Sequence, residues 1–342
     1  MGSDWYHLVD ERATVCAACS LIKQGIVAAR RNSALILLIA PSSALCGTHC
    51  THRSTAVSRL KKPPALTGAP FYCVIGSPIT HSKSPLIHRL FAEQFGLPLQ
   101  YERVEVTPPE FVASVGDLYA AGCQGINVTV PNKSAAFMLG EVRGARAALA
   151  QAANTLWWDA EGRLVVDNTD GMGLVADLRR ATNNGLPGTR ILMLGAGGAA
   201  AGVIPALLAE RPLSLSIANR TEQRARELAT RFSELGVVVA MATDTHVDTP
   251  FDLVINATSA SLSLELPGIP RGAVGRNTLC YDMVYATGST RFLDWAQNLG
   301  VTAWCDGLGM LVEQAACAFN LWHHQRPDTV PVLAALQRMR SS

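Results

Sequence analysis

From Phe71 to the C-terminus, short apolar runs of strand length alternate with longer amphipathic stretches of helix length. The expected strands are residues 71–75, 100–106, 125–130, 191–195, 213–219 and 251–256, and the expected helices are residues 85–95, 109–121, 198–209 and 221–235, with another helix opened by Pro131. This alternation predicts an α/β fold, and residues 191–256 follow the order of a doubly wound nucleotide-binding domain.

The first 69 residues show no such alternation. They are rich in Ala, Ser, Cys and Arg, and they end in the linker-like sequence Lys61-Lys62-Pro63-Pro64. An apolar run from Ala34 to Ala40 is stopped by Pro41, so it is shorter than the roughly 20 residues that a membrane-spanning helix needs. We therefore expect residues 1–69 to be a poorly ordered extension, and we expect no transmembrane helix.

Length and composition indicate a two-domain globular enzyme. The chain has 342 residues, whereas single hydrophobic cores stop growing at roughly 250 residues. A hydrophobic content of 49% and a charged content of 16% exclude a long disordered protein. The sequence contains no basic patch interleaved with aromatic residues, so nucleic acid is not an expected partner.

The cysteines favour a reducing environment. There are nine, an odd number scattered along the chain, which predicts a cytoplasmic protein rather than a disulfide framework. The pairs Cys16-x-x-Cys19 and Cys46-x-x-x-Cys50 leave a zinc site as an alternative, but the second spacing is irregular and lacks a companion His pattern. We expect no metal.

A glycine-rich turn follows the expected strand at residues 191–195. The sequence Gly195-Ala196-Gly197-Gly198-Ala199 permits a tight turn and a close backbone approach just before a helix, which suits a pyrophosphate at the helix N-terminus. Taken alone the turn is a modest signal, because glycine-rich loops also serve plain packing between a strand and a helix.

The next expected strand ends in Asn219-Arg220-Thr221, where NAD-binding domains usually place an acidic residue on the ribose 2′-hydroxyl. Arg220 instead offers a planar, permanently charged donor for a 2′-phosphate, with Arg224 one helical turn beyond it. Asn219 and Thr221 add neutral donors. The sequence therefore favours NADP over NAD, and solvated arginines at a helix start are the alternative.

The sequence also contains several polar motifs outside the expected pyrophosphate and 2′-phosphate sites. Ser82 and Ser84 stand two positions apart between an expected strand and helix, where their hydroxyls can bind a carboxylate. The others, in chain order, are Asn127-Val128-Thr129-Val130-Pro131-Asn132-Lys133, Asn154-Thr155, Asp167-Asn168-Thr169-Asp170-Gly171, Asn256-Ala257-Thr258-Ser259, Tyr281-Asp282-Met283-Val284-Tyr285, and Asp306-Gly307-Leu308-Gly309-Met310-Leu311-Val312-Glu313-Gln314. In this order, the chain from about Phe71 onward closely resembles the shikimate dehydrogenases.

The resemblance implies reversible NADPH-dependent reduction of 3-dehydroshikimate to shikimate, a step of chorismate and aromatic amino acid biosynthesis. It implies that Ser82 and Ser84 bind the substrate carboxylate, that Thr129, Asn154 and Gln314 bind ring hydroxyls, and that Lys133 and Asp170 form the catalytic pair. It also implies a pyrophosphate site at Gly195, Gly197, Gly198 and Ala199, a nicotinamide site at Thr258 and Met283, and a boundary between substrate and cofactor at Tyr285 and Gly307.

The chemistry agrees with these residue types. Hydride transfer to a ketone leaves an alkoxide that must be protonated, and Lys133 is the natural acid for that step. Asp170 would orient the lysine and the reacting hydroxyl. The ordinary alternatives are a surface helix lysine and a helix N-cap carboxylate. We expect His88 and the adjacent Trp157 and Trp158 to be structural.

The expected organisation has a substrate domain at residues 70–169 plus 307–342 and an NADP-binding domain at residues 170–306, in a monomer or a homodimer. Three positions depart from the family pattern: Arg89 stands where Asn is common, and Gln151 and Ser261 stand where Gly is common. Two rival functions remain open: a quinate/shikimate dehydrogenase that uses NAD, and a non-catalytic relative that senses the ligands.

Overall fold

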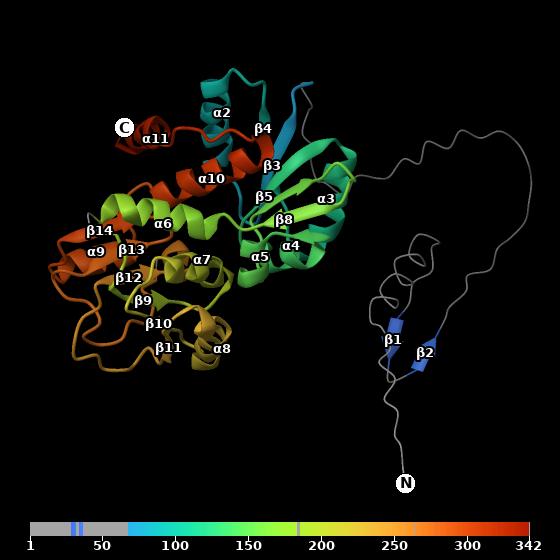
Figure 1. Cartoon of the computed structure of the whole chain (residues 1–342). Helices are drawn as coiled ribbons and strands as arrows, with labels where there is room; N and C mark the ends of the chain where they lie inside the picture. The colour runs from blue at the N-terminus through green and yellow to red at the C-terminus, as the bar shows by residue number, and fades with distance from the viewer. Residues whose placement is uncertain (1–28, 32–33, 37–67, 183–184, 264, 342) are drawn as a thin grey trace, which may run out of the picture. The chain divides into compact units, whose positions relative to one another are not determined.

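The computed structural model describes residues 29–31, 34–36, 68–182, 185–263 and 265–341 (Figure 1). Strands β1 (Ala29–Arg31) and β2 (Ala34–Ile36) pair antiparallel and belong to one unit, and the chain from Gly68 onward belongs to a second, compact unit. The expected poor order of residues 1–69 and the zinc alternative at Cys16 and Cys46 lie almost wholly outside the described residues.

The first half of the compact unit builds a mixed six-stranded sheet. In sheet order its strands are β4 (Gln100–Glu105), β3 (Phe71–Gly76), β5 (Cys123–Val128), β7 (Thr155–Trp158), β8 (Leu164–Asp167) and β6 (Val142–Arg143). β3, β4 and β5 are parallel, whereas β7 runs antiparallel to both of its neighbours. The carboxyl ends of β3, β4 and β5 therefore meet at one edge, which places the segments that follow them side by side.

Helices cover this sheet on both faces. They are α2 (Ser84–Phe95), α3 (Phe111–Ala120), α4 (Lys133–Leu139) and α5 (Ala145–Ala150), with a short 3₁₀ turn η1 (Pro108–Glu110) before α3. Apolar side chains of α3, α4 and α5 pack on one face in a core with β3, β5 and β8. α2 shares a separate core with the C-terminal helices α10 (Leu308–His323) and α11 (Val330–Ser341).

The second sheet has six parallel strands. Its order is β11 (Val238–Met241), β10 (Ser214–Ala218), β9 (Arg190–Leu194), β12 (Leu253–Asn256), β13 (Leu279–Asp282) and β14 (Ala303–Asp306). Starting from the first strand in the chain, β9, this is the 3-2-1-4-5-6 order of a dinucleotide-binding domain. The expected doubly wound fold is confirmed.

The helices of this half are α6 (Asp170–Ala181), α7 (Gly198–Ala209), α8 (Glu222–Phe232) and α9 (Arg291–Asn298), with 3₁₀ turns η2 (Ser233–Leu235) and η3 (Ala260–Ser263). α6, α7 and α8 pack on one face of the sheet and α9 packs on the other. α6 also lies along α10 (Figure 1). Within the described residues, no helix is both long enough and apolar enough to span a membrane.

Two expected helices begin later than the sequence suggested. The helix expected to open at Pro131 begins at Lys133, because the Asn132 backbone N–H donates to the Thr129 carbonyl at 3.1 Å and closes a turn before the helix. Likewise, Pro108 starts a 3₁₀ turn and the α-helix begins at Phe111. The first shift makes Lys133 the first residue of its helix, and that position fixes where the lysine side chain starts.

Candidate active site

Lys133 and Asp170 are brought together from two helix starts. Lys133 opens α4 and Asp170 opens α6. Lys133 Nζ donates a hydrogen bond to Asp170 Oδ2 at 2.6 Å, and the two side chains are only 15% and 6% exposed. Asp170 is not the N-cap of α6, because Thr169 occupies that position. A mostly buried ammonium that keeps some contact with solvent can deliver a proton to a bound ligand.

The carboxamide of Asn154 organises the polar groups around this pair. Asn154 Nδ2 donates to Asp170 Oδ1 at 2.8 Å and lies 3.3 Å from Gln314 Oε1. Asn154 Oδ1 accepts from the backbone N–H of Thr169 at 2.9 Å. Gln314 Nε2 donates to the Leu311 carbonyl at 2.8 Å, which fixes the orientation of that amide on α10. Two residues expected at the substrate, Asn154 and Gln314, thus share one hydrogen-bond network with the catalytic pair.

The first turn of α6 is pressed against α7. A Cβ on Gly171 would lie 2.7 Å from the Ala206 Cβ and 3.0 Å from the Gly202 carbonyl oxygen. On the other side, the Asp170 backbone N–H donates to Asn168 Oδ1 at 3.0 Å. Asn154 therefore holds the Asp170 carboxylate, and the helix that follows the glycine-rich turn fixes the backbone of the next residue, Gly171.

A second chain of polar groups leads from Asn154 to residues 77–84, the segment between β3 and the start of α2 that we call the serine turn. Asn127 Nδ2 donates to the Asn154 carbonyl at 3.2 Å, and Tyr101 donates to Asn127 Oδ1 at 2.7 Å. The Tyr101 phenol lies beside Ser84, and the Ser82 hydroxyl donates to Ser84 Oγ at 3.2 Å. The two serines expected at the substrate carboxylate are thus connected to Asn154 through buried groups.

Tyr101 and Asn127 were not among the residues expected at the site. Burial raises the pKa of the Tyr101 phenol, so the phenol stays protonated and serves as a donor to Asn127. The signal that could have found Asn127 is its position inside an apolar strand, where a polar side chain needs a hydrogen-bond partner.

Tyr285 and Thr129 come to this region from other elements. The Tyr285 phenol lies beside the backbone N–H of Lys83, in the serine turn, and burial raises its pKa. Thr129 follows β5, and its methyl group occupies the space that a Cβ on Gly76 would need. Among the described residues, no hydrogen bond joins the Thr129 hydroxyl to the Asn154 network. Tyr285 therefore lies beside the expected carboxylate site, whereas the Thr129 methyl group faces Gly76.

The glycine-rich turn has the geometry that a dinucleotide requires. Gly195 adopts φ 103°, a conformation that favours glycine, and a Cβ there would lie 3.0 Å from the Thr258 methyl group. Gly197 and Gly198 are exposed, and a Cβ on either would meet nothing within 4 Å, so the start of α7 is open to a ligand. Ala199 continues the first turn of α7. These residues fit a pyrophosphate at the helix N-terminus.

The residues expected at the 2′-phosphate follow β10. Arg220, Thr221 and Arg224 are exposed around the start of α8, and Thr221 occupies its N-cap position. Asn219 Nδ2 donates to the Thr221 carbonyl at 2.8 Å, which ties the turn together. Two exposed cations at one helix start fit an anionic group, which would offset their unfavourable interaction with the helix dipole.

Thr258, Met283 and Gly307 lie together at the carboxyl ends of β12, β13 and β14. A Cβ on Gly307 would lie 2.2 Å from the Met283 carbonyl oxygen, so only glycine permits this approach. Thr258 Oγ1 donates to Asn256 Oδ1 at 2.7 Å. In a doubly wound sheet, this edge is where the reactive part of a dinucleotide is bound.

The departure at Ser261 has a structural consequence. Ser261 Oγ donates to Asp282 Oδ2 at 2.6 Å and accepts from Asn256 Nδ2 at 3.1 Å. The fully buried Asp282 carboxylate also accepts from Thr290 Oγ1 at 2.6 Å. The serine therefore adds a hydrogen bond behind the expected nicotinamide site and does not occupy the site itself.

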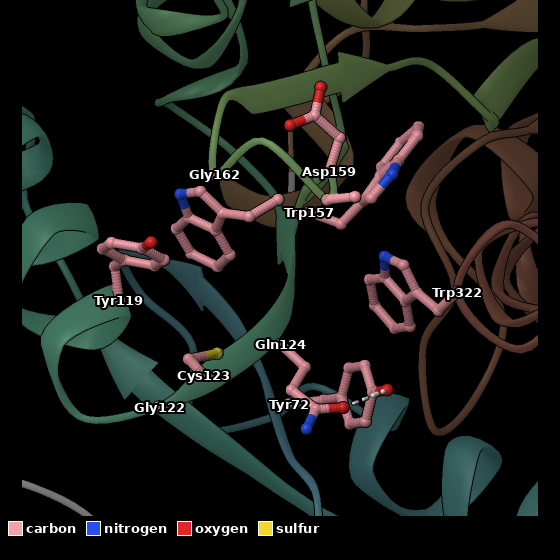
Figure 2. A pocket seen from close by; sticks show the side chains of 11 residues that line it. Tyr72, Tyr119, Gly122, Cys123, Gln124, Trp157, Asp159, Gly162 and Trp322 are labelled. Carbon is pink, nitrogen blue, oxygen red and sulfur yellow. Dashed lines mark hydrogen bonds between the residues drawn. The ribbon is translucent and has the colours of Figure 1, made fainter.

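An aromatic pocket of about 500 Å³ lies at the opposite end of the first sheet (Figure 2). Its aromatic lining consists of Tyr72, Tyr119, Trp157, Trp158 and Trp322. Trp158 stacks on Tyr119 with ring centroids 4.7 Å apart, whereas Trp157 faces the other way, as expected for neighbours on a strand. The pocket flanks the first residues of β5, whereas the active-site residues follow its last residues, so the pocket is separate from the candidate site.

In the part of the chain that the structure describes, no three His, Cys, Asp or Glu side chains converge to hold a metal ion. The polar groups of the site are amides, hydroxyls, one ammonium and one carboxylate. Their chemistry is suited to hydrogen bonding and proton transfer at a small hydroxylated ligand.

Comparisons with known proteins agree with this geometry. Residues 74–156 match the shikimate dehydrogenase substrate binding domain, residues 177–266 match the shikimate / quinate 5-dehydrogenase family, and residues 307–337 match the shikimate 5′-dehydrogenase C-terminal domain. A shikimate dehydrogenase (NADP(+)) of Alkalilimnicola ehrlichii is 49% identical over 266 residues, which cover 78% of this chain and 98% of the relative.

Two solved structures extend the likeness to the fold. An Ael1 enzyme from Pseudomonas putida has a TM-score of 0.73 at 40% identity and covers 78% of this chain and 98% of its own. Shikimate 5-dehydrogenase from Thermus thermophilus, in complex with NADP(H) and shikimate, has a TM-score of 0.68 at 31% identity and covers 79% of this chain and 99% of its own. From its matched domains and from a relative that is 49% identical over 78% of its length, the chain belongs to the shikimate dehydrogenase family.

Proposed function

We propose that this protein catalyses the NADPH-dependent reduction of 3-dehydroshikimate to shikimate, and the reverse reaction, as a step of chorismate biosynthesis. The observation that carries the proposal is the 2.6 Å contact between Lys133 and Asp170, set inside the hydrogen-bond network of Asn154 and Gln314. The complex of the Thermus thermophilus relative with NADP(H) and shikimate supports the same ligands here.

The chain's own groups have separate tasks in this reaction. Ser82 and Ser84 bind the carboxylate of the substrate, and Asn154, Thr129 and Gln314 bind its ring hydroxyls. Lys133 Nζ gives its proton to the oxygen of the reacting carbonyl as the alcohol forms, and takes it back in the reverse direction.

Asp170 contributes by position. Its Oδ2 accepts from Lys133 and its Oδ1 accepts from Asn154, so the ammonium is aimed from a fixed carboxylate. A donor that is already oriented does not have to be ordered during the reaction, which lowers the entropic part of the barrier. We therefore assign Lys133 as the general acid and base, and Asp170 as the group that orients it.

NADPH, when bound, supplies the hydride. Gly195, Gly197, Gly198 and Ala199 would hold the pyrophosphate, and Arg220 with Asn219, Thr221 and Arg224 would hold the 2′-phosphate. Thr258, Met283, Tyr285 and Gly307 would line the nicotinamide side and its border with the substrate. The exposed, positively charged start of α8 supports NADPH over NADH, because it offers charge-assisted hydrogen bonds to a phosphate.

We propose a substrate domain formed by residues 70–169 and 307–342 and an NADP-binding domain formed by residues 170–306. The separate core that α2 shares with α10 and α11 supports placing the C-terminal helices with the first sheet. We also propose a cytoplasmic location, in keeping with the odd number of cysteines, and a monomer or homodimer as the working assembly.

The direct test follows NADPH oxidation by the full chain with 3-dehydroshikimate, and then with NADH in place of NADPH. We expect turnover with NADPH and a kcat/KM at least tenfold lower with NADH. Absence of turnover at millimolar substrate would refute the enzymatic function, and binding of shikimate without turnover would favour the ligand-sensing alternative. Equal use of NADH would refute the assignment at Arg220.

A further inference from the structure

Strand β4 supports the serine turn at three points. Its residues Tyr101, Arg103 and Glu105 alternate along the strand and so project to one face, while Val104 projects into the core on the other. Glu105 Oε1 accepts from the Ser77 hydroxyl at 3.1 Å, at the start of the segment that leads from β3 to α2. The serine turn therefore lies over one face of an edge strand.

The other two contacts reach the expected carboxylate site itself. Arg103 Nε donates to the Ser82 carbonyl oxygen at 2.7 Å, and the Tyr101 phenol lies beside Ser84. These two strand residues therefore hold the two serines that we assign to the carboxylate. Of the two, only Arg103 carries a charge.

The charge of Arg103 also acts on the far border of the same site. Burial raises the pKa of the Tyr285 phenol, whereas the Lys83 backbone N–H and the positive charge of Arg103 act in the opposite direction. The guanidinium is thus within electrostatic reach of a residue that contacts the serine turn from the second half of the chain. The expected carboxylate site therefore combines the neutral hydroxyls of Ser82 and Ser84 with the nearby positive charge of Arg103.

Two neutral hydroxyls alone compensate poorly for the desolvation of a carboxylate. Moving a carboxylate out of water is unfavourable unless charge or several hydrogen bonds compensate for it. Among the described residues, Arg103 uses Nε for its hydrogen bond to the turn, and a guanidinium has four further N–H donors that all carry part of the charge. Its permanent charge can therefore act on a ligand at the serine turn without breaking the contact that shapes the turn.

We propose that Arg103 is a positioning and specificity residue for the substrate carboxylate. It fixes the Ser82 backbone, and its charge favours an acid over a neutral analogue at the serine turn. This inference rests on the proposed function and adds to it a residue that selects carboxylates.

The test compares an acid with its neutral analogue. We would measure oxidation of shikimate and of shikimate methyl ester by NADP⁺ with the wild type, Arg103→Met and Arg103→Lys, and with Arg89→Met as a control that removes an exposed cation from α2. For Arg103→Met we expect the KM for shikimate to rise about tenfold, which corresponds to roughly 1.4 kcal/mol, with kcat and the KM for NADP⁺ changed less than twofold. The KM for the ester should rise clearly less than the KM for shikimate, because the ester loses the support of the turn but gains nothing from the charge.

Arg103→Lys keeps the charge but not the guanidinium geometry, so its KM for shikimate should fall between those of the wild type and Arg103→Met. Arg89→Met should match the wild type with both substrates. An equal rise in KM for acid and ester would overturn the proposal, because it would mean that Arg103 only shapes the turn. Unchanged KM values in Arg103→Met, or an equal effect of Arg89→Met, would overturn it as well.

Failure of the proposed function would look different. If the wild type oxidised neither substrate, the function would be refuted, and calorimetric binding of shikimate and of its methyl ester to the wild type and to Arg103→Met would still decide whether Arg103 selects carboxylates. Thermal unfolding of each variant checks that the fold is intact, and Arg103→Lys provides the comparison if Arg103→Met is unstable.

Discussion

The hydrogen bond between Lys133 and Asp170 allows the proposed proton transfer to be tested by three variants: Lys133→Met, Asp170→Asn and the double substitution. Methionine removes the proton donor but keeps much of the side-chain volume. Loss of a general acid lowers kcat by roughly 10² to 10⁴. We therefore expect Lys133→Met to show a loss in that range with intact folding.

The effect of Asp170→Asn follows from the two hydrogen bonds of the carboxylate. Oδ2 accepts from Lys133 and Oδ1 accepts from Asn154, both of which are donors. An amide has one acceptor oxygen, so it can serve only one of them. Losing one hydrogen bond to a charged group costs about 1.5–3 kcal/mol, which predicts a loss of roughly 10- to 150-fold in kcat.

The double variant shows whether the two residues act as a unit. Because Asp170 works by orienting Lys133, removing it after Lys133 is gone should add little, and the double variant should match Lys133→Met within about threefold. The assay is steady-state NADPH oxidation at saturating 3-dehydroshikimate. The control is Asp159→Asn, which disrupts the exposed ion pair with Arg163 and should leave kcat unchanged. Losses that multiply in the double variant would refute the orienting role of Asp170.

Three further changes test other parts of the structure. Arg220→Gln should raise the KM for NADPH roughly 10- to 100-fold and leave the KM for NADH unchanged, since only NADPH carries the 2′-phosphate; a parallel change in both would contradict the phosphate assignment. Gln151 adopts φ 51°, a left-handed backbone conformation that costs a residue other than glycine about 1 kcal/mol. Gln151→Gly should therefore raise the Tm by about 2 °C in thermal unfolding, and a lower Tm would count against strain at this position. Burial lowers the pKa of His88 to about 3, so the unfolded state binds the proton first as the pH falls below about 6.5. Between pH 7 and pH 5, the free energy of unfolding of the wild type should therefore fall by about 2 kcal/mol more than that of His88→Phe. Urea unfolding measures both, and equal losses would contradict this.

The overall architecture could be predicted from the sequence because each level of the pattern agreed with the next. The apolar strand before Gly195 and the helix after it fixed the first unit of the nucleotide-binding half, and β9 and α7 begin and end within about one residue of the expected positions. Gln151 shows a subtler agreement. Its positive φ explains why glycine is common at that position in the family, a preference that the sequence pattern alone could not explain.

Long-range partnerships could not be predicted in this way. The contact of Ser84 with Tyr101 and the hydrogen bond from Tyr101 to Asn127 join β4, β5 and the serine turn, and they depend on strand order. No periodicity in the sequence reports that β3 lies between β4 and β5. The role of Arg103 could not be predicted for the same reason. In the sequence an isolated arginine on an edge strand resembles any other exposed cation, and only the fold shows that it contacts Ser82.

The contact between Gly171 and α7 limits how this enzyme could be re-engineered. If a nucleotide-binding segment from another protein were grafted after α6, it would bring its own helix against the start of α6. Unless that helix carried residues as small as Gly202 and Ala206 at the contact, it would push the first turn of α6 away, and the Asp170 carboxylate with it. A shift of about 1 Å in such a group can lower the rate a hundredfold. Exchanging the cofactor half would therefore also require matching this interface.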